Sequence, residues 1–174
     1  MPIWEFEGKR PKIDSQVFIA PNATIIGDVE IESGSSIWPG VVIRADFNKI
    51  KIGKNTSIQD NVTIHIEARN PTVIGDNVTI GHNAVLHACT ISNNVIIGMG
   101  AIVLDESKIG EWTIIGAGAV VSPRTEIPSR CMALGIPAKV VKNLDDNGLE
   151  MIRRNAEGYK KLAERYLVQM DKIQ

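Results

Sequence analysis

Aliphatic side chains recur every six residues along most of the chain. The series begins at Ile13 and runs to Ile43, and the spacing resumes at Ile52 and continues, with a few interruptions, to Ile127. Four residues after nearly every aliphatic position stands a small or β-branched residue, such as Val17. An amphipathic helix needs a spacing of about 3.6 residues, so the pattern excludes helical structure over this length.

A six-residue unit is too short to fold alone and must form one side of a coil that stacks on its neighbours. Three units per turn close a triangular prism, with a layer of aliphatic side chains inside each coil. The sequence therefore predicts an all-β solenoid, a parallel β-helix of hexapeptide repeats. An aromatic content of only 5% agrees with a narrow prism in which Ile and Val stack on themselves. An ordinary β-sandwich would not keep a six-residue phase through so many units.

The aliphatic positions sort into three sides of this prism. The first side is headed by Ile19, Ile37, Ile58, Ile80, Ile97 and Ile115. The second side is headed by Ile25, Ile43, Ile64, Leu86, Val103 and Val121. The irregular spacings, which follow Ile43, Ile64 and Leu86, all fall between the second and third sides. One corner of the prism is thus expected to carry all insertions and deletions, and loops on a rigid scaffold are where function tends to lie.

The repeat ends near residue 142, and the remaining residues predict an α-helix with one apolar stripe. The stripe contains Leu149, Ile152, Ala156, Tyr159, Leu162, Ala163, Tyr166, Met170 and Ile173. We expect Asp146 or Asn147 to cap the start of this helix and Gly158 to allow close packing against the prism. The chain is therefore divided into a β-helix domain of residues 1–142 and a C-terminal α-helix of residues 143–174 packed on it.

The chain has three histidines, and all of them fall in two adjacent coils. His65 and His87 each follow an aliphatic head of the second side, so they are expected on successive coils about 4.8 Å apart. Two imidazoles at this separation can bind one metal ion. His82 lies on the first side, where its side chain diverges from the stacked pair. A neighbouring chain that packs its first side on this second side would supply its own His82, and such a head-to-tail contact closes most simply as a threefold ring.

Polar residues stand in the same columns as these histidines. Arg44 lies one coil before His65, and Asp60 lies one coil before His82. Groups of this kind orient imidazole ligands and bound water. The candidates are Arg44, Asp46, Gln59 and Asp60. For the charged members, pairing between chains is an alternative that is compatible with this role, and for each histidine the alternative is a solvated or merely hydrogen-bonded side chain.

Composition narrows the class of partners. The net charge of −1 argues against nucleic acid. No apolar run approaches the length of a membrane span, and the N-terminus MPIWEFEGKRPKID lacks the layout of a signal peptide. Two cysteines, Cys89 and Cys131, do not make a disulfide framework, so we expect a cytoplasmic protein. Cys131 occupies an interior phase and should be inert, whereas Cys89 stands near the ligand corner, where redox control is one option.

The stretch RADFNKIKIGKNTSIQDNVTIHIE, followed by IGHNAVLHAC, resembles the γ-class carbonic anhydrase family, in particular its shorter bacterial and archaeal members. The similarity covers about residues 10–170. It implies a left-handed β-helix and a homotrimer in which His65 and His87 of one chain and His82 of its neighbour hold Zn²⁺. Three imidazoles also suit Co²⁺ or Fe²⁺.

The resemblance also implies a reaction and roles for polar residues. The reaction is the reversible hydration of CO₂ to bicarbonate by a metal-bound hydroxide at the trimer interface. Arg44 and Asp46 fall on an Arg–Asp pair that joins neighbouring chains. Gln59 and Asp60 fall on a Gln–Asp pair, with Gln59 placed to hydrogen-bond the bound water or bicarbonate. Tyr159 matches a tyrosine of the C-terminal helix that reaches toward the site in related short members, although packing of the helix would also explain it.

The chain departs from the most active members of this family in its acidic residues. Those members carry a Glu directly after the Arg-x-Asp motif and an acidic loop after the first ligand. Here Phe47 follows Asp46, the loop is the short IEARNPTV, and Glu67 does not fall on the position of the proton shuttle. A metal site is therefore expected more firmly than rapid turnover.

Two other functions remain open. The segment LGIPAKVVK resembles the end of hexapeptide acyltransferases, so an acyl-CoA-dependent acyltransferase or thioesterase is one alternative. Such enzymes typically need one catalytic His and a groove for coenzyme A, rather than a stacked pair and a third. The other alternative is a metal-binding assembly protein with little turnover.

Overall fold

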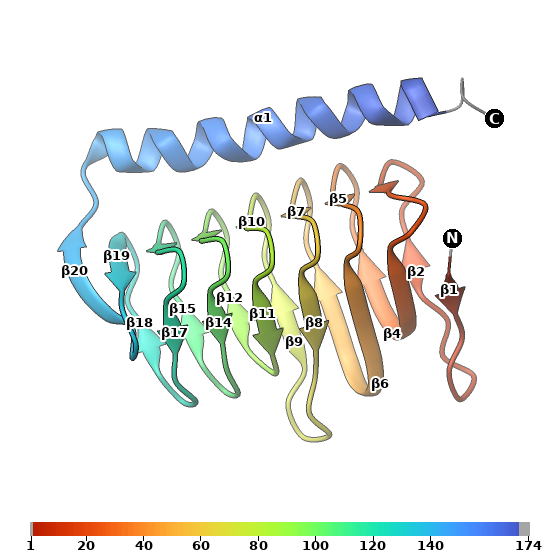
Figure 1. The fold of residues 1–174 in the computed structure, drawn as a ribbon, viewed down its shortest axis with the longest axis horizontal. Helices are drawn as coiled ribbons and strands as arrows, with labels where there is room; N and C mark the ends of the chain where they lie inside the picture. The colour runs from red at the N-terminus through yellow and green to blue at the C-terminus, as the bar shows by residue number, and fades with distance from the viewer. Residues whose placement is uncertain (1, 171–174) are drawn as a thin grey trace.

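The computed structural model describes residues 2–170 and is a left-handed parallel β-helix with one α-helix laid along it (Figure 1). The first side of the prism is one eight-stranded sheet, completed by an antiparallel strand at its end. Its members are β3 (Phe18–Ile19), β5 (Ser36–Ile37), β7 (Ser57–Ile58), β10 (Thr79–Ile80), β13 (Ile96–Ile97), β16 (Ile114–Ile115), β19 (Cys131–Leu134) and β20 (Lys139–Asn143). The predicted fold class is confirmed.

The second and third sides belong to one 12-stranded sheet, because two long strands turn the corner between them without a break. These strands are β4 (Thr24–Ile31) and β6 (Val42–Ile52). The second side also contains β1 (Ile3–Trp4), β8 (Thr63–His65), β11 (Val85–His87), β14 (Ile102–Val103) and β17 (Val120–Val121). The third also contains β2 (Lys12–Ile13), β9 (Thr72–Ile74), β12 (Thr90–Ile91), β15 (Lys108–Ile109) and β18 (Glu126–Ile127).

The register between coils is the one that the six-residue spacing predicts. On the first side Ile58 pairs with Ile80, and on the second side Ile64 pairs with Leu86. The insertions also lie where expected, between the second and third sides, and the longest of them projects between β8 and β9 (Figure 1). The corner beside the histidines therefore tolerates changes in length that the rest of the prism does not.

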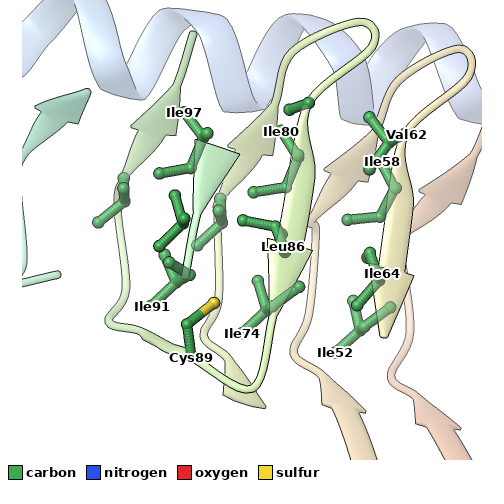
Figure 2. Packing of buried hydrophobic residues seen from close by; sticks show 14 of the residues in the cluster. Ile52, Ile58, Val62, Ile64, Ile74, Ile80, Leu86, Cys89, Ile91 and Ile97 are labelled. Carbon is green, nitrogen blue, oxygen red and sulfur yellow. The ribbon is translucent and has the colours of Figure 1, made fainter. Parts of the chain in front are cut away.

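Stacked aliphatic side chains fill the interior of the prism. Ile58, Ile80 and Ile97 follow one another from coil to coil, each fully buried (Figure 2). Burial of an aliphatic side chain of this size contributes about 1.5–3 kcal/mol, and the same contact repeats in every coil. The core therefore holds the outward-facing residues of adjacent coils in fixed register.

Both cysteines lie inside this core as free thiols. Cys131 is a buried core residue, as predicted. Cys89 is also buried, in the layer that contains Ile91 (Figure 2), and burial raises the pKa of its thiol to about 12. Redox control through Cys89 was therefore the wrong option, because the thiolate is the reactive form and forms only at very high pH.

The α-helix α1 (Asp146–Met170) starts at the end of the last coil and runs back along the first side toward the N-terminal coils (Figure 1). Its stripe packs on the prism through buried Leu149, Ile152 and Ala163. Near its far end the Trp38 ring meets the Tyr159 and Tyr166 rings, at centroid distances of 6.2 and 5.1 Å. Within residues 2–170, no helix combines the length and the apolar character needed to cross a membrane, α1 included.

Two expectations about this helix were wrong. The capping residue is Asp145, whose Oδ1 accepts a hydrogen bond of 2.9 Å from the Gly148 N–H, because the helix begins one residue earlier than the capping prediction assumed. Gly158 is exposed, and a methyl group there would meet nothing within 4 Å, so it does not serve close packing. Ile173, assigned to the stripe, lies outside the described residues, and the domain division at residue 142 remains a prediction.

Candidate metal centre

His65 ends strand β8, and His87 ends strand β11 directly beside it. The two residues are register partners in adjacent parallel strands. Their imidazole rings are tilted by 50°, with centroids 5.1 Å apart. Nδ1 of His65 and Nε2 of His87 approach to 3.1 Å. The sequence prediction that these two histidines stack is thus correct in the structure.

Each of these rings also contacts an aspartate through its other nitrogen. Nε2 of His65 lies 3.0 Å from Oδ1 of Asp46, and Nδ1 of His87 contacts the Asp105 carboxylate. A carboxylate can only accept hydrogen bonds when ionised, so each contact assigns the imidazole proton to the nitrogen that faces the aspartate. With both rings neutral, the remaining lone pairs, on Nδ1 of His65 and Nε2 of His87, point toward each other.

This arrangement fits a metal ion between the two rings. Two lone pairs that face each other at 3.1 Å repel one another, and a shared cation would stabilise both. Two imidazole nitrogens that bind one tetrahedral Zn²⁺ lie about 3.3 Å apart, given Zn–N distances of about 2.0–2.1 Å. A carboxylate on the outer nitrogen is the usual support for a histidine ligand. The donor set thus suits a divalent cation.

Asp46 connects this pair to Arg44. The two residues are separated by one position on strand β6, so their side chains emerge on the same face, and Nη1 of Arg44 donates to Oδ2 of Asp46 within the chain. Burial disfavours the ionised Asp46, but the hydrogen bonds from His65 and Arg44 outweigh burial and lower the pKa of this carboxyl. The Arg–Asp pair that the family resemblance places between chains is thus already formed inside one chain.

His82 follows strand β10 on the first side, away from the stacked pair. Its Nδ1 lies 2.9 Å from Oδ2 of Asp60, and its backbone N–H donates to Oε1 of Gln59 over 3.1 Å. Gln59 is buried, whereas the His82 side chain is 41% exposed. The aspartate therefore occupies one ring nitrogen and leaves Nε2 free to bind a group outside the chain.

Within residues 2–170, no three His, Cys, Asp or Glu side chains of one chain are grouped so that they could hold a metal ion. Asp46 and Asp105 lie on the outer nitrogens of His65 and His87, not at the point where the rings meet. A single chain thus offers two convergent nitrogens, with His82 on a different side of the prism.

Tyr159 approaches the first-side residues from the helix. It packs in the cluster that contains Phe18, Trp38 and Ala163, and its ring meets the Trp38 ring edge-on. Burial and the nearby charge of Asp60 raise the pKa of the Tyr159 hydroxyl. The Tyr159 ring therefore packs on the prism, and its hydroxyl lies near the carboxylate that binds His82.

Exposed apolar side chains border both groups of histidines. Phe47 is 63% exposed, and its ring lies 6.3 Å from that of His65. Met99 is 59% exposed and precedes Gly100, whose N–H donates to the His82 carbonyl. By contrast, the third side carries charged ladders such as Lys108 with Glu126. Each group of histidines thus has an exposed apolar side chain beside it, although other exposed apolar side chains, such as Ile136, lie elsewhere on the molecule.

The sequence reasoning missed Asp105. It lies at the corner after strand β14, one coil beyond His87. The available signal was an acidic residue two places after Val103, which is the register partner of Leu86, so that it stands one position past the residue in register with His87. With Asp105 included, every histidine of the chain has its own aspartate, namely Asp46, Asp60 and Asp105.

Comparisons with known proteins agree with this fold. The model of a family described as bacterial transferase hexapeptide (six repeats) matches residues 10–45 and 88–123. "Gamma carbonic anhydrase 2, mitochondrial" of Arabidopsis thaliana is 44% identical over 162 residues, which cover 90% of this chain and 58% of that protein. "Carbonic anhydrase" of Geobacillus kaustophilus is 42% identical over 164 residues, which cover 94% of this chain and 90% of that protein. The chain thus spans less than two thirds of the plant relative and most of the bacterial one.

Solved structures contain the same fold. A hexapeptide transferase family protein from Anaplasma phagocytophilum superimposes with a TM-score of 0.92 at 40% sequence identity. The match covers 95% of this chain and 98% of that one. The match between the two structures therefore extends beyond the repeat to nearly the whole of both chains.

Proposed function

Because the chain belongs to the γ-class carbonic anhydrase family, we propose that it catalyses the reversible hydration of CO₂ to bicarbonate. The reaction takes place at a metal centre between two subunits of a homotrimer. The observation that carries this proposal is the convergence of His65 Nδ1 and His87 Nε2, each ring held by an aspartate on its other side.

The third ligand in this proposal is His82 of a neighbouring subunit. Its Nδ1 is engaged by Asp60, so Nε2 is the nitrogen available across an interface. Three neutral imidazoles leave one open position on the metal, which is the arrangement of a catalytic site rather than a structural one. When bound, the metal supplies the Lewis acidity that makes water a nucleophile near neutral pH.

The surface of the prism supports a trimer of this kind. α1 covers the first side, so the expected contact of a whole first side with a neighbour's second side was wrong, and the 41% exposed His82 at the corner after β10 is what a neighbour could still reach. The third side carries charged ladders that suit solvent. Exposed Phe47 and Met99 border the two sets of histidines. A neighbouring prism would cover these apolar side chains and bring its own His82 toward this chain's His65 and His87.

Two further residues act on the substrate side of the proposed site. Oε1 of Gln59 accepts from the His82 backbone, which leaves the amide N–H₂ of Gln59 to donate to water or bicarbonate beside the metal. The Tyr159 hydroxyl, whose pKa is raised by burial and by the nearby charge of Asp60, donates a second hydrogen bond that orients the product. Arg44 donates to the Asp46 carboxylate and holds it in place, and this carboxylate in turn orients the ring of His65.

Zn²⁺ is the metal that we propose, and the same three imidazoles would accept Co²⁺ or Fe²⁺. The test is stopped-flow CO₂ hydration with anaerobically purified protein of known metal content. We expect a rate well above buffer that rises with metal occupancy, and we expect His87→Ala to lose both metal and rate. A fully metallated wild-type protein with no rate above buffer between pH 6 and 9 would reject carbonic anhydrase activity.

The similarity to a hexapeptide transferase family protein favours one second candidate, an acyl-CoA-dependent acyltransferase or thioesterase. Its signature would be consumption of acetyl-CoA that continues after the metal is removed by a chelator. A protein that binds metal stoichiometrically yet shows neither activity would instead be a metal-binding assembly component. The same purified samples distinguish all three outcomes.

A further inference from the structure

Asp105 lies at a corner of the prism that is tied to the coils on both sides. The backbone N–H of Glu106 donates to the Ala88 carbonyl of the preceding coil over 2.8 Å. The backbone N–H of Arg124 donates to the Asp105 carbonyl from the following coil, also over 2.8 Å. The position of the Asp105 carboxylate relative to His87 is therefore set by the ladder of the β-helix rather than by a flexible loop.

The imidazole of His87 is the partner of this carboxylate. Among the described residues, no lysine or arginine pairs with Asp105, although such pairs are frequent elsewhere on this surface. Its side chain remains 37% exposed, so the aspartate is not needed to fill the core. The contact with His87 Nδ1 is the one specific interaction that the carboxylate makes in this part of the molecule.

We propose that Asp105 is a positioning residue that keeps the proton of His87 on Nδ1 and the lone pair of Nε2 turned toward His65. This inference rests on the proposed function, because it concerns the metal site described above. Asp46 has the matching effect on His65 through the opposite ring nitrogen, Nε2. The two aspartates thus impose opposite tautomers on the two rings, which is the condition for both lone pairs to meet at one point.

Loss of Asp105 would leave His87 free to place its proton on either nitrogen and to rotate about its side-chain bonds. One of the two neutral tautomers would then present an N–H, not a lone pair, to His65 Nδ1. Loss of a carboxylate that supports a histidine ligand typically weakens metal binding about 10- to 100-fold. The fold should not change, because Asp105 is partly exposed and its backbone contacts remain.

The test compares three variants of the full chain: Asp105→Ala, Asp105→Asn and Glu106→Ala. Glu106 is the matched control, because it stands at the same corner and its exposed side chain also carries a negative charge. Zinc affinity is measured by competition with a chelator at one fixed pH, and thermal unfolding is measured in parallel. We expect Asp105→Ala to bind zinc about 10- to 100-fold more weakly, with Glu106→Ala unchanged and Asp105→Asn in between, because an amide oxygen still accepts from Nδ1–H.

A second measurement uses metal-free protein and reports the tautomer directly. Long-range ¹H–¹⁵N spectra distinguish a protonated ring nitrogen from an unprotonated one. We expect the Nδ1–H form of His87 in the wild type and in Glu106→Ala, and a mixture of forms in Asp105→Ala. A wild-type-like tautomer and affinity in Asp105→Ala would overturn the inference.

The failure of the proposed function would look different. A wild-type protein that binds zinc tightly but does not hydrate CO₂ would reject the activity, while the loss of affinity in Asp105→Ala would still support the positioning role. If the wild type bound no zinc, the tautomer of His87 in metal-free protein would still decide for or against Asp105.

Discussion

Nδ1 of His65 lies 3.1 Å from Nε2 of His87, and the two residues are register partners in adjacent parallel strands. Their separation therefore depends on the ladder of the β-helix, which varies little, and on two aspartates that orient the rings. His82 follows a strand of a different side of the prism and does not join this pair. The chemistry of the site thus depends on assembly as much as on the fold of one chain.

A shared site predicts complementation between two defective chains. His82→Ala and His87→Ala proteins should each form trimers with almost no bound metal. If the two are denatured, mixed in equal amounts and refolded together, about one quarter of the sites will combine an intact His65–His87 pair with an intact His82, because neighbours assemble at random in a closed ring. Metal content and CO₂ hydration of the mixture measure this recovery, and no recovery would mean that the ligands are not shared between chains.

Gly81 separates His82 from the core residue Ile80, and its hydrogen faces the next coil. A methyl group there would lie 2.7 Å from the Met99 backbone nitrogen. Gly81→Ala should therefore destabilise the fold by about 1–3 kcal/mol and weaken metal binding by displacing His82. Gly110→Ala is the matched control, since its methyl would lie 2.5 Å from the Ser129 backbone nitrogen, away from the histidines. Both should lower the urea midpoint, and equal metal affinity in the two variants would contradict the prediction.

Substitution of Gly158 should have the opposite effect on stability from that of Gly81. It is an exposed residue inside α1, and a methyl group there meets no atom within 4 Å. Gly158→Ala should raise the free energy of unfolding by about 1 kcal/mol, because alanine loses less backbone entropy than glycine on forming a helix. Chemical denaturation measures the change. A decrease in stability would show that α1 packs more closely at this point than the structure indicates.

A substitution at Tyr159 tests whether packing of the ring or hydrogen bonding by the hydroxyl explains the tyrosine at this position. Tyr159→Phe keeps the ring against Trp38 and removes only the hydroxyl. We expect unchanged thermal stability and a kcat of CO₂ hydration about fivefold lower, as the loss of a hydrogen bond worth about 1 kcal/mol predicts. Trp38→Phe, which changes the same cluster without touching the hydroxyl, is the control. A wild-type kcat in Tyr159→Phe would leave the residue a packing role only.

The two thiols should be unreactive in the folded protein. Burial raises the pKa of Cys89 to about 12 and also raises the pKa of Cys131. Since a raised thiol pKa leaves less thiolate at every lower pH, about one Cys89 in a thousand is ionised at pH 9. We expect no reaction with Ellman's reagent between pH 7 and 9 and two thiols per chain after unfolding in guanidinium. Rapid labelling of the native protein would contradict the assigned burial.

The six-residue spacing by itself determined the prism, its three sides and the stacking of His65 on His87. In a solenoid the residues that touch are one coil apart, so a local repeat specifies most of the tertiary contacts. The buried face of the C-terminal helix could be predicted for a similar reason, because the spacing of its apolar residues shows which face packs on the prism. The same pattern explained the low aromatic content and predicted the corner at which the insertions lie.

Only the tertiary structure showed the path of the backbone where the six-residue spacing is interrupted and the direction in which side chains point. The corner beyond β14 brings Asp105 to His87, and the short turn after His87 directs Cys89 into the core. Arg44 turns to Asp46 inside the chain because both emerge on one face of the same strand. Side-chain rotamers and corner geometry are set by packing between coils, and a repeat in the sequence gives the register of a residue but not the direction of its side chain.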